Sequence, residues 1–284
     1  MTRAGYLGPE GTFTHAAVLA TPGSGELELV ALPTIVDTVQ AVADGEVALG
    51  LVPIENSIEG SVSATLDTLS MDTQDVSIVG EVVQEIEQCL IGPAGLALEE
   101  IEVVASHPQA SAQCAHYLHR TLPHARVMTT TSTADAVRLV SERGGNWAAL
   151  GPRVAAERYG ASVLVDSVED HDGNRTRFVW LARRGGPVSQ FPAGRRDGAW
   201  KTSIVFWGQG TDQPGWLVRC LSELSERGVN MTRIESRPLK QRLGEYMFFI
   251  DCSGASDAAP LSAALPALRR HVEVFRALGS YPAA

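Results

Sequence analysis

The stretch that decides the fold reads DGNRTRFVWL, residues 172–181, a polar turn followed at once by an apolar strand. Glycine tolerates positive φ, and aspartate and asparagine hydrogen-bond their own backbone, so the first three residues are typical of a turn. Side chains alternate between the two faces of a strand, which places Thr176 and Phe178 on one face, opposite the flanking arginines. We therefore expect a hydroxyl and an aromatic ring together at the mouth of a sheet.

Length and composition indicate an ordinary globular protein. The chain has 284 residues, 44% of them hydrophobic and 20% charged, a length that favours two units over one. Its net charge of −10 disfavours nucleic acid as a partner. No window approaches the ~18–20 apolar residues of a membrane span, so no membrane partner is expected. The start lacks a secretory pattern and the four cysteines lack metal-binding spacing, so we expect a cytoplasmic protein with no metal.

Strand-like and helix-like segments alternate up to about residue 182. The expected strands cover residues 4–7, 47–52, 76–79, 83–91, 101–105, 126–129, 147–150, 162–166 and 176–181. The expected helices cover residues 14–19, 35–43, 61–69, 109–118, 132–142 and 152–159. Such alternation predicts mostly parallel sheets that are buried on both faces. The long run 79–91 looks like a strand that leaves one sheet and enters another, which predicts two lobes with a cleft between them, the second lobe spanning about residues 80–165.

The pattern changes after residue 182. Residues 183–200 are rich in Gly, Pro and Arg without a hydrophobic period, which is typical of a linker. Residues 201–280 then follow the order βαββαβ, with strands at 201–207, 229–238, 245–252 and 272–279 and helices at 215–227 and 260–270. This order predicts a ferredoxin-like domain. We therefore expect a first domain at 1–182, a linker at 183–200 and a second domain at 201–280.

Two polar loops follow the first expected strands. Thr12 or Thr14 is a good cap for the helix after the first strand, and the free N–H groups of that helix favour an anion. Glu55, Asn56 and Ser57 stand at the carboxyl end of a buried strand, which is where open α/β sheets place their ligands. These loops supply a hydroxyl, an amide and a carboxylate in a position suited to binding.

A third polar loop reads SHPQ at residues 106–109. Ser106 can cap the helix that follows, on which Gln109 and Gln113 share one face and can both reach a cleft. His107 is expected to hold this loop by hydrogen bonds. The chain has no Ser-His-Asp order, no phosphate-binding loop and no dinucleotide-binding loop after a strand. A reaction without a cofactor, on a small anionic substrate, therefore fits best.

Four motifs closely resemble signatures of the prephenate dehydratase family: GPEGTFT at residues 8–14, VPIENS at 52–57, SHPQ at 106–109 and NRTRF at 174–178. The tail resembles the regulatory ACT domain of that family through ESRP at residues 235–238. The resemblance covers nearly the whole chain. It implies an α/β fold with a two-lobed, periplasmic-binding-protein-like catalytic domain and a ferredoxin-like ACT domain.

The resemblance also implies an activity, the decarboxylative dehydration of prephenate to phenylpyruvate on the way to phenylalanine, with no cofactor. It places the essential threonine at Thr176. Glu55, near a dianionic substrate, could have a raised pKa and supply the proton. The other residues expected to bind the substrate are Thr12, Asn56, Ser57, Ser106, Gln113, Arg177 and Phe178.

In the family, phenylalanine binds between ACT domains of two subunits and inhibits the enzyme. The resemblance therefore implies a homodimer or homotetramer built through residues 201–280. The implied effector site comprises Gly215, Leu217, Asn230, Met231, Glu235, Ser236, Arg237 and Pro238. A family motif, Gly-Ala-Leu-Val, reads GWLV at residues 215–218. Trp216 either packs outward without effect or reshapes the amino-acid pocket.

Two alternatives stay open at this point. Arogenate dehydratase performs the same elimination on the amino-acid analogue of prephenate, and nothing in the sequence separates the two substrates. A non-catalytic ligand sensor could also combine two hinged lobes with an ACT tail. A sensor needs no hydroxyl beside a leaving group, so the position of Thr176 favours an enzyme.

Overall fold

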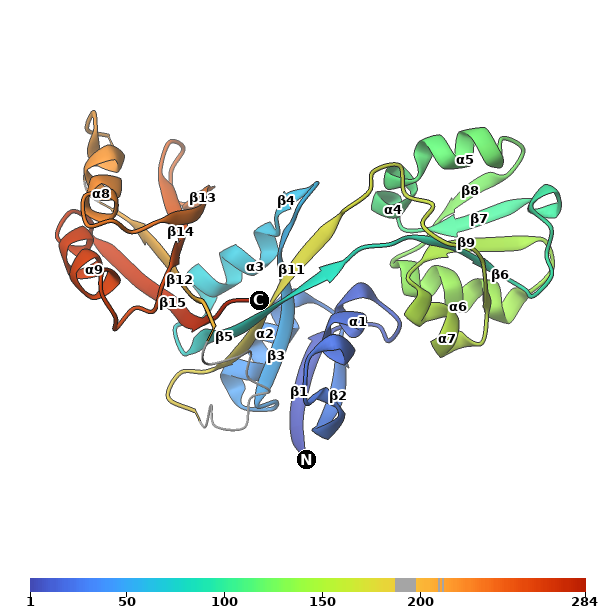
Figure 1. Ribbon diagram of the computed structural model, residues 1–284, viewed down its shortest axis with the longest axis horizontal. Coiled ribbons are helices and arrows are strands. Elements are labelled where there is room, and N and C mark those ends of the chain that lie inside the picture. The colour runs from blue at the N-terminus through green and yellow to red at the C-terminus, as the bar shows by residue number, and fades with distance from the viewer. Residues whose placement is uncertain (187–197, 209, 211) are drawn as a thin grey trace.

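The computed structural model describes residues 1–186, 198–208, 210 and 212–284. Three units lie in a row, with the first lobe between the second lobe and the C-terminal domain (Figure 1). Within the described residues, no helix combines the length and the apolar character needed to cross a membrane. The expected linker at 183–200 lies mostly outside the described residues.

The first lobe is built on a mixed sheet. Its strands are β1 (Thr2–Leu7), β2 (Leu27–Leu32), β3 (Leu49–Asn56), β4 (Gly60–Ser61), β5 (Val76–Glu85) and β11 (Arg175–Arg183). They lie in the order β2-β1-β3-β11-β5, with β4 beside β3. Its helices are α1 (Phe13–Ala20), α2 (Ile35–Asp44) and α3 (Ser63–Asp67), with helical turns η1 (Ser24–Glu26) and η2 (Thr68–Asp72).

The second lobe has a mixed sheet of its own, in the order β10-β6-β9-β7-β8. Its strands are β6 (Cys89–Gly92), β7 (Val103–Ser106), β8 (Arg126–Thr129), β9 (Trp147–Gly151) and β10 (Ser162–Val165). Its helices are α4 (Pro108–Gln113), α5 (Ala115–Thr121), α6 (Thr133–Arg143) and α7 (Arg153–Tyr159), with a short turn η3 (Leu98–Glu100). The lobes are joined by β5 leading to β6 and by the chain from β10 to β11 (Figure 1). The expectation that residues 79–91 pass from one sheet into the other is confirmed. The segment is not one continuous strand, because residues 86–88 separate β5 from β6.

The expectation of mostly parallel sheets is wrong. β11 runs antiparallel to both β3 and β5, and β6 runs antiparallel to both β9 and β10. The cause is the double connection between the lobes, because the chain leaves the first sheet on β5 and returns on β11 in the opposite direction. The edge strand β2 was not expected, and the helix expected at 109–118 is divided into α4 and α5 at Cys114.

The C-terminal domain has the expected order βαββαβ. It consists of β12 (Trp200–Trp207), α8 (Trp216–Ser225), β13 (Met231–Pro238), β14 (Tyr246–Ser253), α9 (Leu261–Arg269) and β15 (Val274–Pro282). The antiparallel sheet has the order β13-β14-β12-β15. Alternation along its strands divides the side chains between two cores. Ile204 and Phe206 pack against α8 and α9, whereas Val205 faces the other way.

The C-terminal sheet shares a hydrophobic core with the first lobe. Val205, Phe249 and Tyr281 belong to the same buried cluster as Ile54 and Ile78 of the first sheet. β15 also lies against β5, where Gly279 fits closely over the backbone of residue 78. The face of the first sheet on which Ile54 and Ile78 lie is thus covered partly by α2 and α3 and partly by the C-terminal domain.

Candidate active site

A cavity of about 550 Å³ lies between the two lobes. The first lobe contributes the loop after β1 and the adjoining ends of β3 and β11, and the second lobe contributes the starts of α4 and α6. Thr176 and Phe178 both line it, as expected from the alternation of side chains along β11. The hydroxyl and the ring therefore share one face at the mouth of the sheet.

The Thr176 hydroxyl is oriented by a neighbouring amide. Asn56 Nδ2 donates a hydrogen bond to Thr176 Oγ1 at 2.9 Å, and both side chains are buried. Asn56 Oδ1 accepts hydrogen bonds from the backbone N–H groups of Ile58 at 3.0 Å and Glu59 at 2.9 Å, which fixes the orientation of the amide. Because Thr176 Oγ1 accepts from Asn56, its own proton is available to a ligand.

Three helices begin at this cavity. α1 is capped by Thr12, whose hydroxyl accepts a hydrogen bond from the N–H of His15 at 3.3 Å. α6 is capped by Ser132, and α4 is capped by the ring of His107. The first N–H groups of a helix have no partner within it and carry a partial positive charge. The N-terminal ends of the two longer helices, α1 and α6, therefore favour the binding of anions in this cavity.

Glycine is required in the loop that leads to Thr12. Gly11 has φ +86° and lies against α7 of the second lobe. A Cβ at this position would stand 3.2 Å from the Cα of Ala155. The loop therefore approaches the second lobe more closely than any other residue would permit.

Helix ends and amides, rather than cationic side chains, supply the positive potential. Among the described residues that line the cavity there is no lysine or arginine. Asp135 is the one carboxylate among them, and it accepts hydrogen bonds from Thr131 and Ser132. Although burial acts to raise its pKa, hydrogen bonds from Thr131, Ser132 and Arg138 outweigh burial and lower the pKa of this carboxyl. Asp135 is therefore a poor proton donor near neutral pH.

His107 caps α4 at the edge of the cavity. Its Nδ1 accepts a hydrogen bond from the backbone N–H of Gln109 at 3.3 Å, which confirms that it holds the loop. In the neutral ring the proton must then be on Nε2. His107 also lines the cavity, so the residue whose imidazole caps α4 stands beside the place for a ligand.

Five of the expected catalytic and substrate-binding residues line the cavity and four do not. Those in the lining are Thr12, Asn56, Gln113, Thr176 and Phe178. Those outside it are Glu55, Ser57, Ser106 and Arg177. Ser57 Oγ accepts from the backbone N–H of Arg175 at 2.9 Å, and Ser106 is fully buried with its hydroxyl donating to the carbonyl of His107 at 3.1 Å. Both serines therefore shape loops beside the cavity.

Glu55 and Arg177 lie on the opposite face of the strand pair, and this corrects their expected placement. They face each other across β3 and β11, and Arg177 reaches Glu55 with a 3.0 Å ion pair. Both join a group of six charged side chains at the boundary with the C-terminal domain. We name this group the interdomain ion cluster: Glu55, Glu81, Arg177, Lys201, Arg233 and Asp251. The alternation that brings Thr176 to the cavity turns its neighbour away from it.

Arg177 is fully engaged in this cluster. Its guanidinium meets Glu81 at 3.1 Å and Asp251 at 2.5 Å, and the side chain is only 9% exposed. Burial acts to lower the pKa of Arg177, but the carboxylates of Asp251, Glu81 and Glu55 outweigh burial and raise it. The charge on Arg177 is thus balanced within the protein and does not serve a ligand in the cavity.

Sequence reasoning missed two kinds of residue around the cavity. The first group is residues 131–135, which follow β8 and form the start of α6. The sequence contained a sign of this helix start, the hydroxyl-rich run TST followed by an acid at the third helical position. Gln88 also lines the cavity, and Asn174 lies beside it. Within the described parts of the chain, Gln88 Oε1 and Asn174 Nδ2 are buried without a hydrogen-bond partner. No sequence pattern distinguished Gln88, whereas Asn174 opens the NRTRF motif but was interpreted only as a turn residue.

The residues expected to bind an effector are distributed over two faces of the C-terminal sheet. Glu235 accepts a hydrogen bond from Ser61 at 2.9 Å, and Arg237 pairs with Asp67 at 2.9 Å, so both contact the first lobe. Ser236 and Pro238 alternate with them and are exposed. The remaining members are Gly215, which caps α8, Leu217 on α8, and Asn230 and Met231 at the start of β13.

Trp216 packs inward. It is buried between Phe206 and Phe248, and its Nε1 donates to the carbonyl of His271 at 2.7 Å. Of the two alternatives open for Trp216, outward packing is therefore excluded. The ring belongs to the core of the C-terminal domain.

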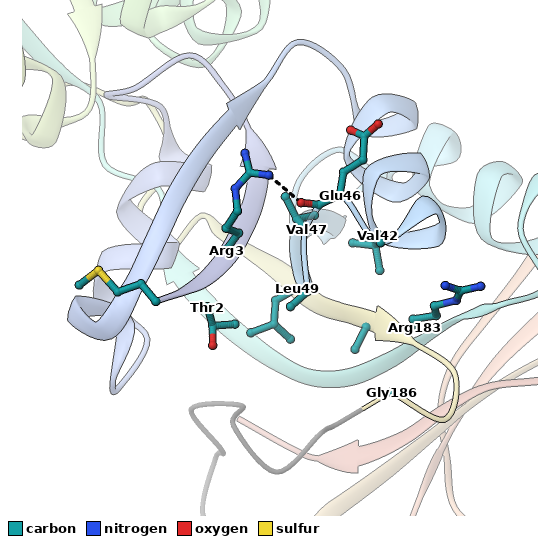
Figure 2. A pocket seen from close by; sticks show the side chains of 12 residues that line it. Thr2, Arg3, Val42, Glu46, Val47, Leu49, Arg183 and Gly186 are labelled. Atoms are coloured by element: carbon teal, nitrogen blue, oxygen red, sulfur yellow. Dashed lines mark hydrogen bonds between the residues drawn. The ribbon is translucent and has the colours of Figure 1, made fainter.

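A second cavity of about 410 Å³ lies at the other end of the first sheet. Figure 2 shows Thr2, Leu49 and Arg183 around it, with Arg3 donating to the carbonyl of Glu46 at 2.8 Å. These residues stand at the amino end of β3, whereas ligands of α/β sheets bind at carboxyl ends. The interlobe cavity is therefore the stronger candidate.

Comparisons with known proteins show the family of the chain. A family model described as prephenate dehydratase matches residues 4–186. A prephenate dehydratase of Mycobacterium tuberculosis is 38% identical over 290 residues, covering 99% of this chain and 87% of that protein. The structure of Arthrobacter aurescens prephenate dehydratase in complex with L-Phe has a TM-score of 0.87 at 35% identity, covering 99% of this chain and 90% of that one. A structure described as GqqA, a novel type of quorum quenching acylases, has a TM-score of 0.84 at 32% identity, covering 99% and 98%.

Proposed function

Because the chain belongs to the prephenate dehydratase family and is therefore a lyase, we propose that its interlobe cavity converts prephenate into phenylpyruvate. One observation carries the assignment of the site. The Thr176 hydroxyl, oriented by Asn56, faces a cavity bounded by helix N-termini from both lobes. This arrangement combines a donor for a leaving hydroxyl with a place for anionic groups.

The reaction needs little chemistry from the protein. Prephenate, a dianion, takes up one proton and yields the phenylpyruvate monoanion, carbon dioxide and water. The bond from the ring to its carboxylate breaks, its electron pair enters the ring, and the bond from the ring to the hydroxyl breaks as the hydroxyl receives the proton. Formation of the aromatic ring drives this elimination. The protein must hold both carboxylates and stabilise the departing oxygen.

The residues of the cavity divide these tasks. We place the departing hydroxyl at Thr176, because the proton of Oγ1 is directed away from Asn56. The carboxylates lie toward the starts of α1 and α6, where Thr12 and Ser132 hold the first turns. Phe178 and Phe13 offer apolar walls for the ring. The absence of lysine and arginine among the described lining residues keeps the ring carboxylate from being stabilised too well before it leaves as carbon dioxide.

His107 takes the donor role that the sequence suggested for Glu55, because Glu55 lies outside the cavity. We expect His107→Asn to lower kcat by about 10²-fold, since asparagine still caps a helix but lacks the Nε2–H donor. His107→Gln should recover part of the loss, because its amide restores an N–H group at nearly the same reach. Steady-state kinetics of the two variants check this. Equal kcat for the wild type and His107→Asn would exclude the donor role.

The direct test of the proposed function is turnover. The purified protein should convert prephenate to phenylpyruvate, followed by its absorbance in alkali, with arogenate assayed in parallel. Conversion of prephenate at a rate well above the uncatalysed reaction supports the proposal. Conversion of arogenate alone would show that arogenate is the substrate, and conversion of neither compound would refute the proposed function.

An acylase activity, as described for GqqA, is less consistent with the site. Acyl transfer requires a nucleophile that a neighbouring base can deprotonate. Here Thr176 Oγ1 accepts a hydrogen bond from an amide whose orientation is fixed by Ile58 and Glu59. Asn56 therefore cannot remove the proton of Thr176.

We propose that the C-terminal domain is an ACT domain that binds L-phenylalanine and lowers activity at Thr176. Its βαββαβ order and the L-Phe bound by the Arthrobacter relative support this proposal. So do the pairs Glu235–Ser61 and Arg237–Asp67, because they join the ESRP motif to the first lobe. A ligand that changes these contacts has a direct route to the catalytic domain.

Phenylalanine should bind and inhibit, and Arg237→Ala should weaken that inhibition by about 5-fold or more. The reason is that Arg237 links the effector motif to Asp67 with bonds of 2.9 and 3.1 Å. Calorimetry measures binding, and initial rates with and without phenylalanine measure inhibition. Arg242→Ala, in the exposed turn before β14, is the control and should respond like the wild type. Failure of the intact protein to bind phenylalanine would refute the regulatory proposal.

We also propose that the protein is at least a dimer through its C-terminal domain. β13 lies at the edge of the sheet, so its outer backbone groups are available for pairing with a second chain. Ile234 on β13 is 50% exposed and Val218 on α8 is 65% exposed. An open strand edge beside exposed apolar side chains suits a symmetric contact.

A further inference from the structure

The strand pair that carries the oriented hydroxyl has a second face, and that face is anchored in the C-terminal domain. Thr176 stands opposite Asn56, and Arg177 stands opposite Glu55. The first pair lines the cavity with a 2.9 Å hydrogen bond. The second pair forms a 3.0 Å ion pair on the far side. Thr176 and Asn56, which line the cavity, are thus next in the chain to Arg177 and Glu55 of the interdomain ion cluster.

Asp251 fixes the outer end of Arg177. Its Oδ2 lies 2.5 Å from the guanidinium, and its Oδ1 accepts from Ser203 Oγ at 2.5 Å. Ser203 is in turn 2.8 Å from the hydroxyl of Tyr281. These three residues come from β14, β12 and β15, and all are buried. Arg177 is therefore tied to the middle of the C-terminal sheet and not to a mobile surface side chain.

The same domain also holds Glu55. Arg233 on β13 lies 3.7 Å from Glu55 and 3.8 Å from Asp251, and it donates to Ser61 at 2.6 Å. The cluster contains three carboxylates and three cations, so its charges balance. Removing one carboxylate would leave a cation uncompensated in a poorly solvated place, which the cluster can relieve only by rearranging.

We propose that Asp251 is a positioning residue for Thr176, acting through Arg177, and this inference rests on the proposed dehydratase function. Asp251 does not line the cavity. It holds the side chain of Arg177 in place. Because Thr176 precedes Arg177 on β11, the position of the Thr176 hydroxyl is fixed as well. A displacement of about 1 Å at a reacting group can lower a rate by about 10²-fold. A residue of the C-terminal domain thereby sets the rate in the catalytic domain.

The test compares two Asp→Asn changes at the same domain boundary. Asp251→Asn keeps the size of the side chain and its bond to Ser203 but removes the charge that holds Arg177. We expect kcat to fall by about 10-fold or more with KM nearly unchanged, because the residues that contact the substrate are retained. Asp67→Asn is the matched control, since Asp67 pairs with Arg237 and Lys240 across this boundary but lies on α3. It should keep the wild-type kcat.

A second readout does not depend on activity. Amide hydrogen exchange of a peptide spanning residues 172–180 should be faster in Asp251→Asn and unchanged in Asp67→Asn. If Asp251→Asn does not fold, Ser203→Ala replaces it, because it removes one bond to Asp251 and should give a smaller loss of kcat in the same direction.

The outcomes separate this inference from the proposed function. A folded Asp251→Asn protein with wild-type kcat and wild-type exchange at residues 172–180 would overturn the inference, as would an equal loss in Asp67→Asn. A wild-type protein that does not convert prephenate would overturn the proposed function, and the exchange comparison would still decide whether Asp251 positions β11.

Discussion

Replacing Thr176 by alanine should lower kcat by about 10²–10³-fold, the usual cost of removing one donor that stabilises a developing negative charge. The hydroxyl is buried, lines the interlobe cavity and is oriented by Asn56. Its loss also leaves the Asn56 amide with one bond fewer. Thr176→Ser should keep partial activity, because the hydroxyl remains and only a methyl group is removed. Steady-state kinetics with prephenate give kcat for the wild type, Thr176→Ala and Thr176→Ser.

A second buried threonine provides the control. Thr21 lies at the end of α1, donates to the carbonyl of Ala17 at 2.9 Å and accepts from Trp180. It is not among the residues that line the cavity. Thr21→Ala should lower stability without changing kcat. If Thr176→Ala retained wild-type kcat, the hydroxyl would have no part in the reaction.

Replacing Arg177 by methionine should lower the free energy of unfolding by about 3–5 kcal/mol, the typical cost of removing one partner from a buried ion pair. Methionine fills much of the space but leaves Glu55, Glu81 and Asp251 facing only Lys201 and Arg233. Glu81 and Asp251 are 2% and 3% exposed, so water cannot replace the lost partner. The midpoint of urea unfolding measures the change.

Arg153→Met is the matched control for this prediction. Arg153 pairs with Asp166, but the two side chains are 57% and 58% exposed. The loss of such a pair should cost within about 1 kcal/mol. Similar unfolding midpoints for the two variants would show that the interdomain ion cluster adds nothing beyond an exposed pair.

The alternation of side chains along β11 was sufficient to place Thr176 and Phe178 together at the cavity. The same alternation put Arg177 on the far face, yet the motif shared with the family suggested a substrate contact for it. What Arg177 meets there depends on how the C-terminal sheet packs against the first lobe. Asp251 lies 74 residues away along the chain. No local pattern reports such a contact.

The sequence pattern located most elements but misjudged the direction of strands. Apolar runs alternating with helices predict parallel pairing, and β1, β2 and β3 do pair in parallel. β11 carries an equally apolar run and is antiparallel, because direction depends on the two connections between the lobes. β2 has the sequence LELVAL and lies at the edge of the sheet, where none of its side chains is fully buried.

The anion-binding character of the cavity was predictable only in part. Thr12 or Thr14 was expected to cap the helix after the first strand, and the structure has Thr12 as the cap. The start of α6 was seen as a helix but not as part of the site, because its place opposite Thr176 depends on how the lobes face each other. Gln88 lies at residues 86–88, where the crossing run breaks between β5 and β6.

The most direct measurement is a crystal structure of Thr176→Ala with prephenate bound. We expect prephenate in the interlobe cavity, with its carboxylates at the starts of α1 and α6 and its ring hydroxyl next to residue 176 and Asn56. No lysine or arginine from the residues described here should contact it. Prephenate bound in the cavity between Thr2, Leu49 and Arg183, or held by Arg177, would show that the interlobe cavity is not the active site.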